Sequence, residues 1–281
     1  MTFNEYLQAK QFTPKVIKEI VRELIHLESW TEERTLKLAS LRHEQLIEYV
    51  AELQEKVTPQ TIKNRLRAYN HYFEYLKEEN IITHNPVKGI QIKNEAKKKL
   101  NILAQDKLEE IYNNYQPKGR RAIFQKVLLG LIIYQATDQG TLERIQLNDV
   151  NLEKSEIYLK SSRRSNARKL ALKGSQLMPL YKYMEKVKVK NQTKLFGFSM
   201  SNQLRYLQSS VRETERQIKT IRQLRHSCIA NWLKIYNQRE VQYYCGYRHI
   251  GSIERYQIED VESLKDQLAE LHPLKNLKMK P

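Results

Sequence analysis

The spacing of apolar residues predicts helices over most of the first ninety positions. Thr-Pro pairs at 13–14 and 58–59 are typical helix starts, because threonine caps a helix and proline fits its first turn. Between them, the pattern predicts another helix from Arg42 to Lys56. Apolar residues recur every three or four positions in each segment. These residues are Ile17, Ile20, Val21, Leu24 and Ile25; then Leu46, Ile47, Val50 and Leu53; then Ile62, Leu66, Tyr69, Tyr72, Phe73 and Leu76.

The helical pattern stops at Asn85-Pro86, because the residue before a proline avoids the helical conformation. Lys93–Lys99 is polar, lysine-rich and without periodicity, which is typical of a linker. Beyond it the pattern predicts more helices and three short strands. The helices are expected at 104–115, 119–137, 175–189, 202–217, 222–235 and 238–245, and the strands at 150–152, 156–159 and 169–172.

These elements predict a mainly α protein with two domains. We expect a helical N-terminal domain at 1–92, a linker at 93–102 and a second domain at 103–281. The second domain is expected to be mostly helical with a small three-stranded antiparallel sheet, because turn residues separate the three strands.

Composition excludes several function classes. The chain has 281 residues but only 8 glycines, and no two of them are spaced for a dinucleotide fold or a P-loop. The longest apolar run, 127–134, is far short of the roughly 18 residues that span a bilayer. The N-terminus lacks a signal-peptide pattern, and two cysteines form neither a disulfide framework nor a zinc site. We therefore expect an intracellular, soluble chain with no metal, no cofactor and no membrane partner.

The charge is strongly one-sided. Residues 1–96 balance 14 basic residues against 14 glutamates, so the second part of the chain carries the whole formal charge of +17. Such an excess is typical of a protein that binds a polyanion, most often nucleic acid. In the neutral first part, Lys63, Arg65 and Arg67 form a basic cluster on the third predicted helix. That cluster is either a DNA contact or a solvated face.

The turn between the second and third strands is the most basic segment. Positions 160–169 hold five basic residues and no acid, on a loop where side chains are free to reach a ligand. Arginine suits phosphate geometry, and small serine and asparagine residues let a backbone approach closely. The alternative is a solvated surface loop. The basic residues are Lys160, Arg163, Arg164, Arg168 and Lys169.

Two further segments carry groups suited to phosphate chemistry. Arg222 and Arg225 lie three apart at a helix start, which suits either a phosphodiester clamp or a structural arginine pair. The segment 245–256 adds Arg248 as a cation and three hydroxyl or imidazole groups, Tyr247, His249 and Tyr256. A tyrosine is more often a core residue, but a phenol attacks phosphorus when cations stabilise the added charge. Residues 263–273 form an amphipathic tail that docks either on its own domain or on a neighbouring subunit.

Taken in order, these segments resemble the tyrosine-type recombinases, which include phage and mobile-element integrases, and the resemblance covers nearly the whole chain. The family's helical, SAM-like core-binding domain typically ends in a Thr-Pro-capped helix and an Asn-Pro-x-x-Gly-Ile turn, here Thr58-Pro59 and 85–90. Its Leu-Arg-His-Ser helix start corresponds to 224–227, and its Gly-His element with a later tyrosine falls on 246–256. The variant wording of this last element resembles a subgroup found on mobile elements.

The chain departs from the family pattern at most catalytic positions. Only Arg225 and Tyr256 match outright. The family's first arginine, its acidic partner, its hairpin lysine and its two histidines fall on Asp138, Thr141, Arg163, Arg222 and Tyr247. Arginine does not act as an acid, because its pKa stays above about 12. An aspartate beside the scissile phosphate repels it.

The resemblance implies a DNA recombinase or integrase in which Tyr256 forms a 3′-phosphotyrosyl link. Arg225, Arg222 and the pair Arg163-Arg164 would stabilise the phosphate, and His249 would protonate the leaving group. The implied partners are double-stranded DNA and further copies of the chain, joined through the tail as dimers or tetramers in the cytoplasm, at the nucleoid. The alternative is a relative that has lost cleavage and acts as a DNA-binding accessory protein. A basic RNA-binding or ribosome-associated protein explains the charge but not the ordered motifs.

Overall fold

The structure is a computed structural model, which describes residues 1–93, 100–119, 121–189, 191–197, 199–256 and 268. The chain divides into two compact units, 1–97 and 98–281, and each is described here by itself. The division falls within the segment 93–102 that we expected to be a linker. Within the described ranges, no helix combines the length and apolar character needed to cross a membrane.

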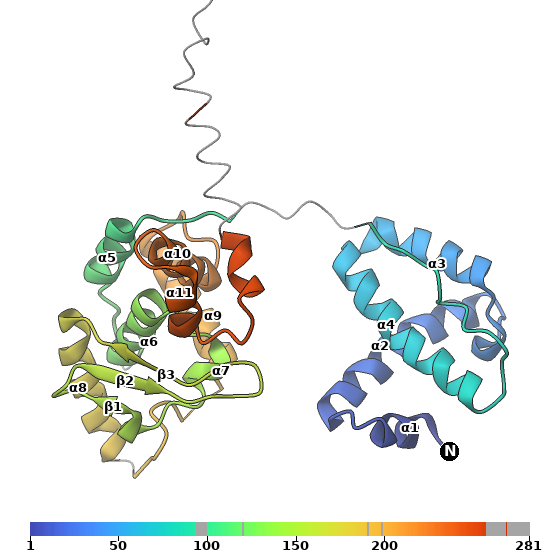
Figure 1. Ribbon diagram of the computed structural model, residues 1–281, viewed down its shortest axis with the longest axis horizontal. Helices are drawn as coiled ribbons and strands as arrows, with labels where there is room; N and C mark the ends of the chain where they lie inside the picture. The colour runs from blue at the N-terminus through green and yellow to red at the C-terminus, as the bar shows by residue number, and fades with distance from the viewer. Residues whose placement is uncertain (94–99, 120, 190, 198, 257–267, 269–281) are drawn as a thin grey trace, which may run out of the picture. The chain divides into compact units, whose positions relative to one another are not determined.

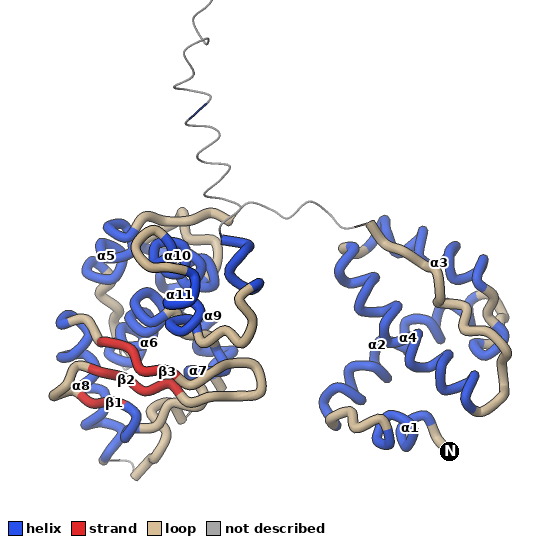
Figure 2. The backbone as a smooth tube through the Cα atoms, in the orientation of Figure 1, coloured by secondary structure: helices blue, strands red, loops and turns tan. Residues whose placement is uncertain are grey.

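The first unit is entirely helical over its described residues (Figures 1 and 2). The two longest helices, α2 and α4, begin at the prolines of the Thr-Pro pairs and pack against each other. Thr58 caps α4 with its hydroxyl, which accepts from the Thr61 N–H at 3.3 Å, whereas Thr13 makes no side-chain cap. The elements are α1 (Phe3–Ala9), α2 (Pro14–Glu33), the 3₁₀ turn η1 (Leu38–Ser40), α3 (His43–Lys56) and α4 (Pro59–Glu78).

The turn after α4 is fastened to that helix by Asn85. Its side-chain amide donates to Glu74 Oε1 at 2.8 Å and to Asn70 Oδ1 at 2.9 Å. Its own Oδ1 accepts from the Val87 N–H at 3.0 Å. The Asn-Pro motif thus ends the first unit by closing the chain back onto the core, where Val87 is buried.

The second unit combines helices with one small sheet and matches the predicted class, mostly helical with a small antiparallel sheet (Figure 2). Most predicted boundaries lie within three residues of the observed ones. Two short elements, α7 and η2, were not expected. The elements are α5 (Gln105–Asn114), α6 (Ala122–Gln135), α7 (Gln139–Leu142), η2 (Leu147–Asp149), β1 (Val150–Asn151), β2 (Glu156–Leu159), β3 (Arg168–Ala171), α8 (Gly174–Lys188), α9 (Met200–Thr214), α10 (Ile221–Leu233) and α11 (Gln238–Cys245).

The sheet has the order β1-β2-β3 with both pairs antiparallel. In β2 and β3 the register pairs Ile157 with Leu170 and Leu159 with Arg168. Side chains alternate between the two faces of a strand, and Leu170 and Arg168 are buried while Lys169 is exposed. The first residue of β3 therefore points inward, although it is an arginine.

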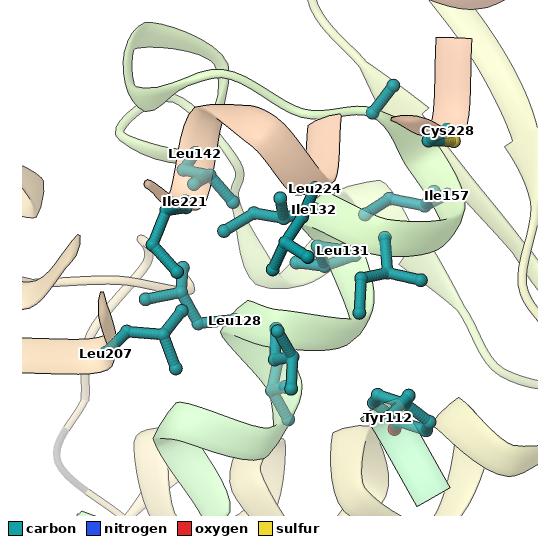
Figure 3. Packing of buried hydrophobic residues seen from close by; sticks show 14 of the residues in the cluster. Tyr112, Leu128, Leu131, Ile132, Leu142, Ile157, Leu207, Ile221, Leu224 and Cys228 are labelled. Carbon is teal, nitrogen blue, oxygen red and sulfur yellow. The ribbon is translucent and has the colours of Figure 1, made fainter. Parts of the chain in front are cut away.

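Helix α6 is the centre of the second core, because it is apolar on nearly every side and packs against α5, α8 and α10. Figure 3 shows Leu128, Leu131 and Ile132 of α6 near Ile221 and Leu224 of α10. A helix that is apolar on all sides is buried in the core of its domain. This packing fixes the start of α10, where the Arg222 and Arg225 positions lie.

Candidate active site

The second unit contains a cavity of about 1190 Å³ that collects side chains from distant parts of the sequence. Its walls come from the α7 region, the β2–β3 hairpin, α9, the start of α10 and the segment 247–256. Six of the residues proposed as catalytic line it, although the sequence separates the first from the last by more than ninety positions. They are Arg163, Arg164, Arg222, Arg225, Tyr247 and Tyr256.

The tip of the β2–β3 hairpin is a tight turn that presents two arginines. The Ser162 and Ser165 backbones exchange hydrogen bonds at 2.8 and 3.3 Å, so Arg163 and Arg164 lie at the tip, where both are exposed. The turn is tied to the chain that leads to Tyr256, because Arg248 Nη2 donates to the Ser162 carbonyl at 2.9 Å. Arg248, expected to contact DNA, thus has at least one structural partner.

Arg225 and the two tyrosines form a connected chain of polar groups. Arg225 Nε donates to the Ala136 carbonyl at 2.7 Å, and its Nη1 donates to Tyr247 Oη at 3.1 Å. Tyr247 Oη lies 3.4 Å from Tyr256 Oη, and either hydroxyl can donate. The phenol of Tyr247 therefore links the Arg225 guanidinium to the Tyr256 hydroxyl.

The Tyr256 side chain is 4% exposed and lines the cavity wall. Burial raises the pKa of its phenol well above the ordinary value, and the nearby Tyr247 phenol raises it further, while Arg225 opposes the rise. The ring of His226 packs edge-on against the Tyr256 ring, with 5.6 Å between centroids. Tyr256 is therefore a neutral, well-packed phenol in the cavity wall.

His226 also lines the cavity, and it is uncharged at neutral pH. Burial lowers its pKa to about 4, with smaller contributions from Arg255, Arg225 and Arg222. The imidazole is 9% exposed. It is therefore a neutral packing partner of Tyr256 rather than a proton donor at pH 7.

Asp138, at the position of the family's first arginine, begins α7 and opens onto the cavity. Its Oδ1 accepts from the Thr141 N–H at 2.7 Å, which is a helix cap. Partial burial raises the pKa of this carboxyl, but the Thr141 N–H and the charges of Arg225 and Arg168 outweigh it and lower the pKa. The aspartate is thus a charged cap among guanidiniums.

The structure corrects the interpretation of Arg168 as a loop cation that reaches DNA. Arg168 is 2% exposed, and its Nε and Nη1 have no hydrogen-bond partner. Burial lowers its pKa to about 10, against the favourable charge of Asp138. The reason lies in the strand period: Arg168 shares the inward face of β3 with Leu170, so it cannot turn outward with its neighbours.

Lys160 and Lys169, which were also expected to contact DNA, both form ion pairs on the protein. Lys160 pairs with Asp149 at 3.2 Å, and Lys169 is exposed and pairs with Glu156 at 3.4 Å. Both flank the cavity's hairpin without lining the cavity itself.

In the first unit, the side chain of Arg65 is 13% exposed and pairs with Glu23 at 3.5 Å. This placement does not fit the expected DNA contact. Lys63 and the exposed Arg67 line a separate cavity of about 420 Å³. The basic cluster is therefore divided, because Lys63 and Arg67 border one cavity whereas Arg65 pairs with Glu23.

Two further expectations concern the C-terminal segment. His249 is exposed and is not among the residues that line the cavity, so its expected role as the leaving-group acid has no geometric support. The tail at 263–273 lies outside the described residues, apart from position 268.

The cavity is also lined by three arginines that were not predicted from the sequence: Arg144, Arg205 and Arg255. Arg255 lies over the Tyr256 ring, with 5.8 Å from its Cζ to the ring centroid. Its position beside Tyr256 in the sequence was a usable signal. Arg144 and Arg205 gave none, because a single arginine in a loop or on an amphipathic helix has no distinctive spacing.

Comparisons with known proteins agree with this architecture. Residues 1–80 match the family model described as "Phage integrase, N-terminal SAM-like domain". No curated protein matches the chain. Among solved structures, the XerH site-specific recombinase bound to palindromic difH substrate is 18% identical with a TM-score of 0.73, covering 90% of this chain and 79% of that one.

Two other structures are similar over comparable lengths. A lambda integrase dimer bound to a COC′ core site is 14% identical with a TM-score of 0.70, and the match covers 90% of this chain and 74% of that one. The Tn1549 transposon integrase in complex with circular intermediate DNA is 15% identical with a TM-score of 0.67, covering 95% of this chain and 100% of that one. At these identities the likeness is one of fold. The chain shares its fold with these recombinase and integrase structures, and its residues 1–80 are similar to the SAM-like N-terminal domain of phage integrases.

Proposed function

We propose that this protein is a DNA recombinase or integrase that cuts and rejoins strands through Tyr256. One observation carries the proposal: Tyr256, Arg225 and six further arginines line the same cavity. A phenol among guanidiniums is the arrangement that phosphoryl transfer to tyrosine requires, because the cations stabilise the charge that develops on the phosphate. The relatives of similar fold were solved with DNA.

The chemistry follows from the chain of polar groups. Tyr256 Oη attacks the phosphorus, the bond from phosphorus to O5′ breaks, and a 3′-phosphotyrosyl link and a 5′-hydroxyl result. Tyr247 Oη, 3.4 Å from the nucleophile, takes the Tyr256 proton and passes its own proton to O5′. Protons and bonds balance, and the reverse reaction with another 5′-hydroxyl rejoins the strands. Bond energy is conserved, so the step itself consumes no nucleotide.

Arg225 has two tasks in this scheme. Its Nη1 bond to Tyr247 fixes the direction of that phenol's lone pairs, which leaves the Tyr247 proton for transfer. Its charge also stabilises the pentacoordinate phosphate, to which the exposed Arg163, Arg164 and Arg222 contribute. The raised pKa of Tyr256 implies that the attack begins from the neutral phenol.

The proposed partners are double-stranded DNA and further copies of this chain. The excess positive charge lies in the unit that contains the cavity, which suits binding to a DNA backbone. We propose that the copies assemble on DNA through the tail at 263–273, in the cytoplasm and at the nucleoid.

A DNA-binding accessory protein without cleavage activity is the second candidate. Asp138 favours it, because a carboxylate now opens onto the cavity at the position of the family's first arginine. The two candidates share the fold and the charge, and they differ only in whether Tyr256 reacts.

A suicide substrate distinguishes the two candidates. The protein selects its own duplex site from a random DNA library, and that site is then nicked so that cleavage releases a short fragment and traps the intermediate. We expect wild-type protein to form a covalent adduct and Tyr256→Phe to form none while binding the site equally well. Tight binding by the wild type without an adduct would establish the accessory protein instead.

A further inference from the structure

Arg144 has unused donor capacity in the wall of the cavity. It follows α7 in the short loop that leads to η2, and its backbone N–H is fixed to the Thr141 carbonyl at 3.0 Å. Within the described residues, its Nε is buried without a partner, and its side chain makes one long hydrogen bond, 3.4 Å from Nη2 to Ser165 Oγ. A guanidinium offers five donors, so most of this group's capacity faces no protein acceptor.

Arg144 and Asp138 lie on either side of Gly140. A Cβ placed on Gly140 would be 3.4 Å from Arg144 Nη1 and 3.7 Å from Asp138 Oδ1. The charges of Arg225 and Arg168 also act on Asp138, and those of Arg225 and Arg144 act on Arg168. Two guanidiniums, those of Arg225 and Arg168, thus act on the Asp138 carboxylate, and that of Arg144 lies near it across Gly140, so positive charge exceeds negative charge in this group.

We propose that Arg144 is a catalytic residue that contacts a non-bridging oxygen of the scissile phosphate beside Arg225, in place of the cation absent at position 138. The inference rests on the proposed function. Arg225 has already committed Nε to Ala136 and Nη1 to Tyr247. Three of its five N–H groups, on Nη1 and Nη2, remain for the phosphate, and Arg144 adds a second guanidinium to the clamp.

Preorganisation favours Arg144 over the cations at the hairpin tip. Arg163 and Arg164 are exposed, so ordering their side chains on a phosphate costs conformational entropy. Arg144 is half-buried and already held by its loop and by Ser165. Donors that are fixed before the reaction give the larger stabilisation of a transition state. Asp138 serves as the counter-ion of this group.

The test compares Arg144→Ala and Arg144→Lys with wild type in single-turnover cleavage of the suicide substrate. Each protein is given a normal phosphodiester and a methylphosphonate at the scissile position, which replaces a charged oxygen by a neutral methyl group. Arg239→Ala, an exposed arginine on α11 that donates to Gln242, is the control. Site affinity is measured in parallel.

We expect Arg144→Ala to slow adduct formation on the phosphodiester by about 10²–10³-fold, the usual loss for one oxyanion donor. On the methylphosphonate, Arg144→Ala should form the adduct at the wild-type rate, because this substrate lacks the charged oxygen that Arg144 contacts. Arg144→Lys should recover part of the rate, and affinity should be nearly unchanged. Equal losses on both substrates, or no loss on either, would overturn the role of Arg144 alone. Failure of wild type to form any adduct would overturn the proposed function and this inference together.

Discussion

Gly246 shows how a single backbone position shapes the site. It ends α11 in the left-handed conformation with φ +69°, and a Cβ there would lie 2.3 Å from Arg168 Nη1 and 3.0 Å from the Asn166 carbonyl oxygen. Its carbonyl accepts from the Asn166 N–H at 2.9 Å, which ties the hairpin to this turn. The glycine therefore allows the buried arginine, the hairpin and the Tyr247 segment to meet.

Gly246→Ala should destabilise the second unit through both strain and collision. A left-handed residue with a side chain costs about 1–2 kcal/mol, and forcing a Cβ against a packed group adds about 1–3 kcal/mol. Gly119→Ala is the matched control, because Gly119 has φ +84° but nothing within 4 Å of the added Cβ. Chemical denaturation should show a larger loss at 246 than at 119. Equal losses would mean that Arg168 moves aside freely.

Tyr247→Phe tests the proposed proton transfer from Tyr256 through Tyr247 to the leaving O5′. Removing the hydroxyl should slow cleavage by about 10²-fold or more, the lower end for general acid–base catalysis. A substrate with sulfur in place of the bridging O5′ has a leaving group that needs no proton, so the variant should recover on it. A loss that persists with the sulfur substrate would give Tyr247 a structural role, through its bond to Arg225.

Among the elements, the amphipathic helices and the hairpin strands could be predicted from the sequence, because their spacing reflects the core that they face. The helix α7 could not, because four residues have no periodicity and its start is set by the Asp138 cap. The inward direction of Arg168 was available in principle, since it alternates with Leu170 on β3. The cluster of basic neighbours concealed that signal.

The candidate site was predictable only where residues were adjacent or matched a family motif. Arg225 and Tyr256 fall in such motifs, and the structure brings them to one cavity. Arg144 and His249 could not be placed from the sequence, because their positions relative to the cavity depend on loop geometry that the spacing of residues does not encode. The first lines the cavity unexpectedly, and the second does not line it.

Helix α10 makes the second unit sensitive to acid through His226. The pKa of His226 is about 4 in the folded protein and about 6.5 in the unfolded chain. The unfolded chain therefore binds the proton first as the pH falls. The contribution of His226 to the free energy of unfolding is greatest above pH 6.5. It declines as the pH falls toward 4 and is constant below that. The loss is at most about 3 kcal/mol, at 1.36 kcal/mol per pKa unit.

Denaturation followed by Trp232 fluorescence in a Trp30→Phe background measures this decline in the second unit. His226→Gln should flatten the decline between pH 6.5 and 4, whereas His84→Gln, an exposed histidine of the first unit, should leave it unchanged. A decline that is just as steep in His226→Gln would assign the acid sensitivity to other groups.

At the scale of the whole molecule, the charge distribution determines how salt affects DNA binding. Each phosphate contact contributes a slope of about −0.9 to the dependence of log affinity on log salt. Arg163→Ala with Arg164→Ala should therefore reduce the slope by about 2. Arg22→Ala, which removes an arginine paired with Glu23 at 2.8 Å in the net-neutral first part of the chain, should not change it. An unchanged slope in the hairpin variant would exclude the tip from the DNA contact.

The central claim is that Tyr256 is the nucleophile of a strand-transfer reaction. The most direct measurement is mass spectrometry of the trapped adduct after protease and nuclease digestion. Our account predicts one modified peptide, carrying a nucleotide 3′-phosphate on Tyr256 and absent in Tyr256→Phe. A nucleotide attached to any other residue, or an adduct that persists in Tyr256→Phe, would contradict it.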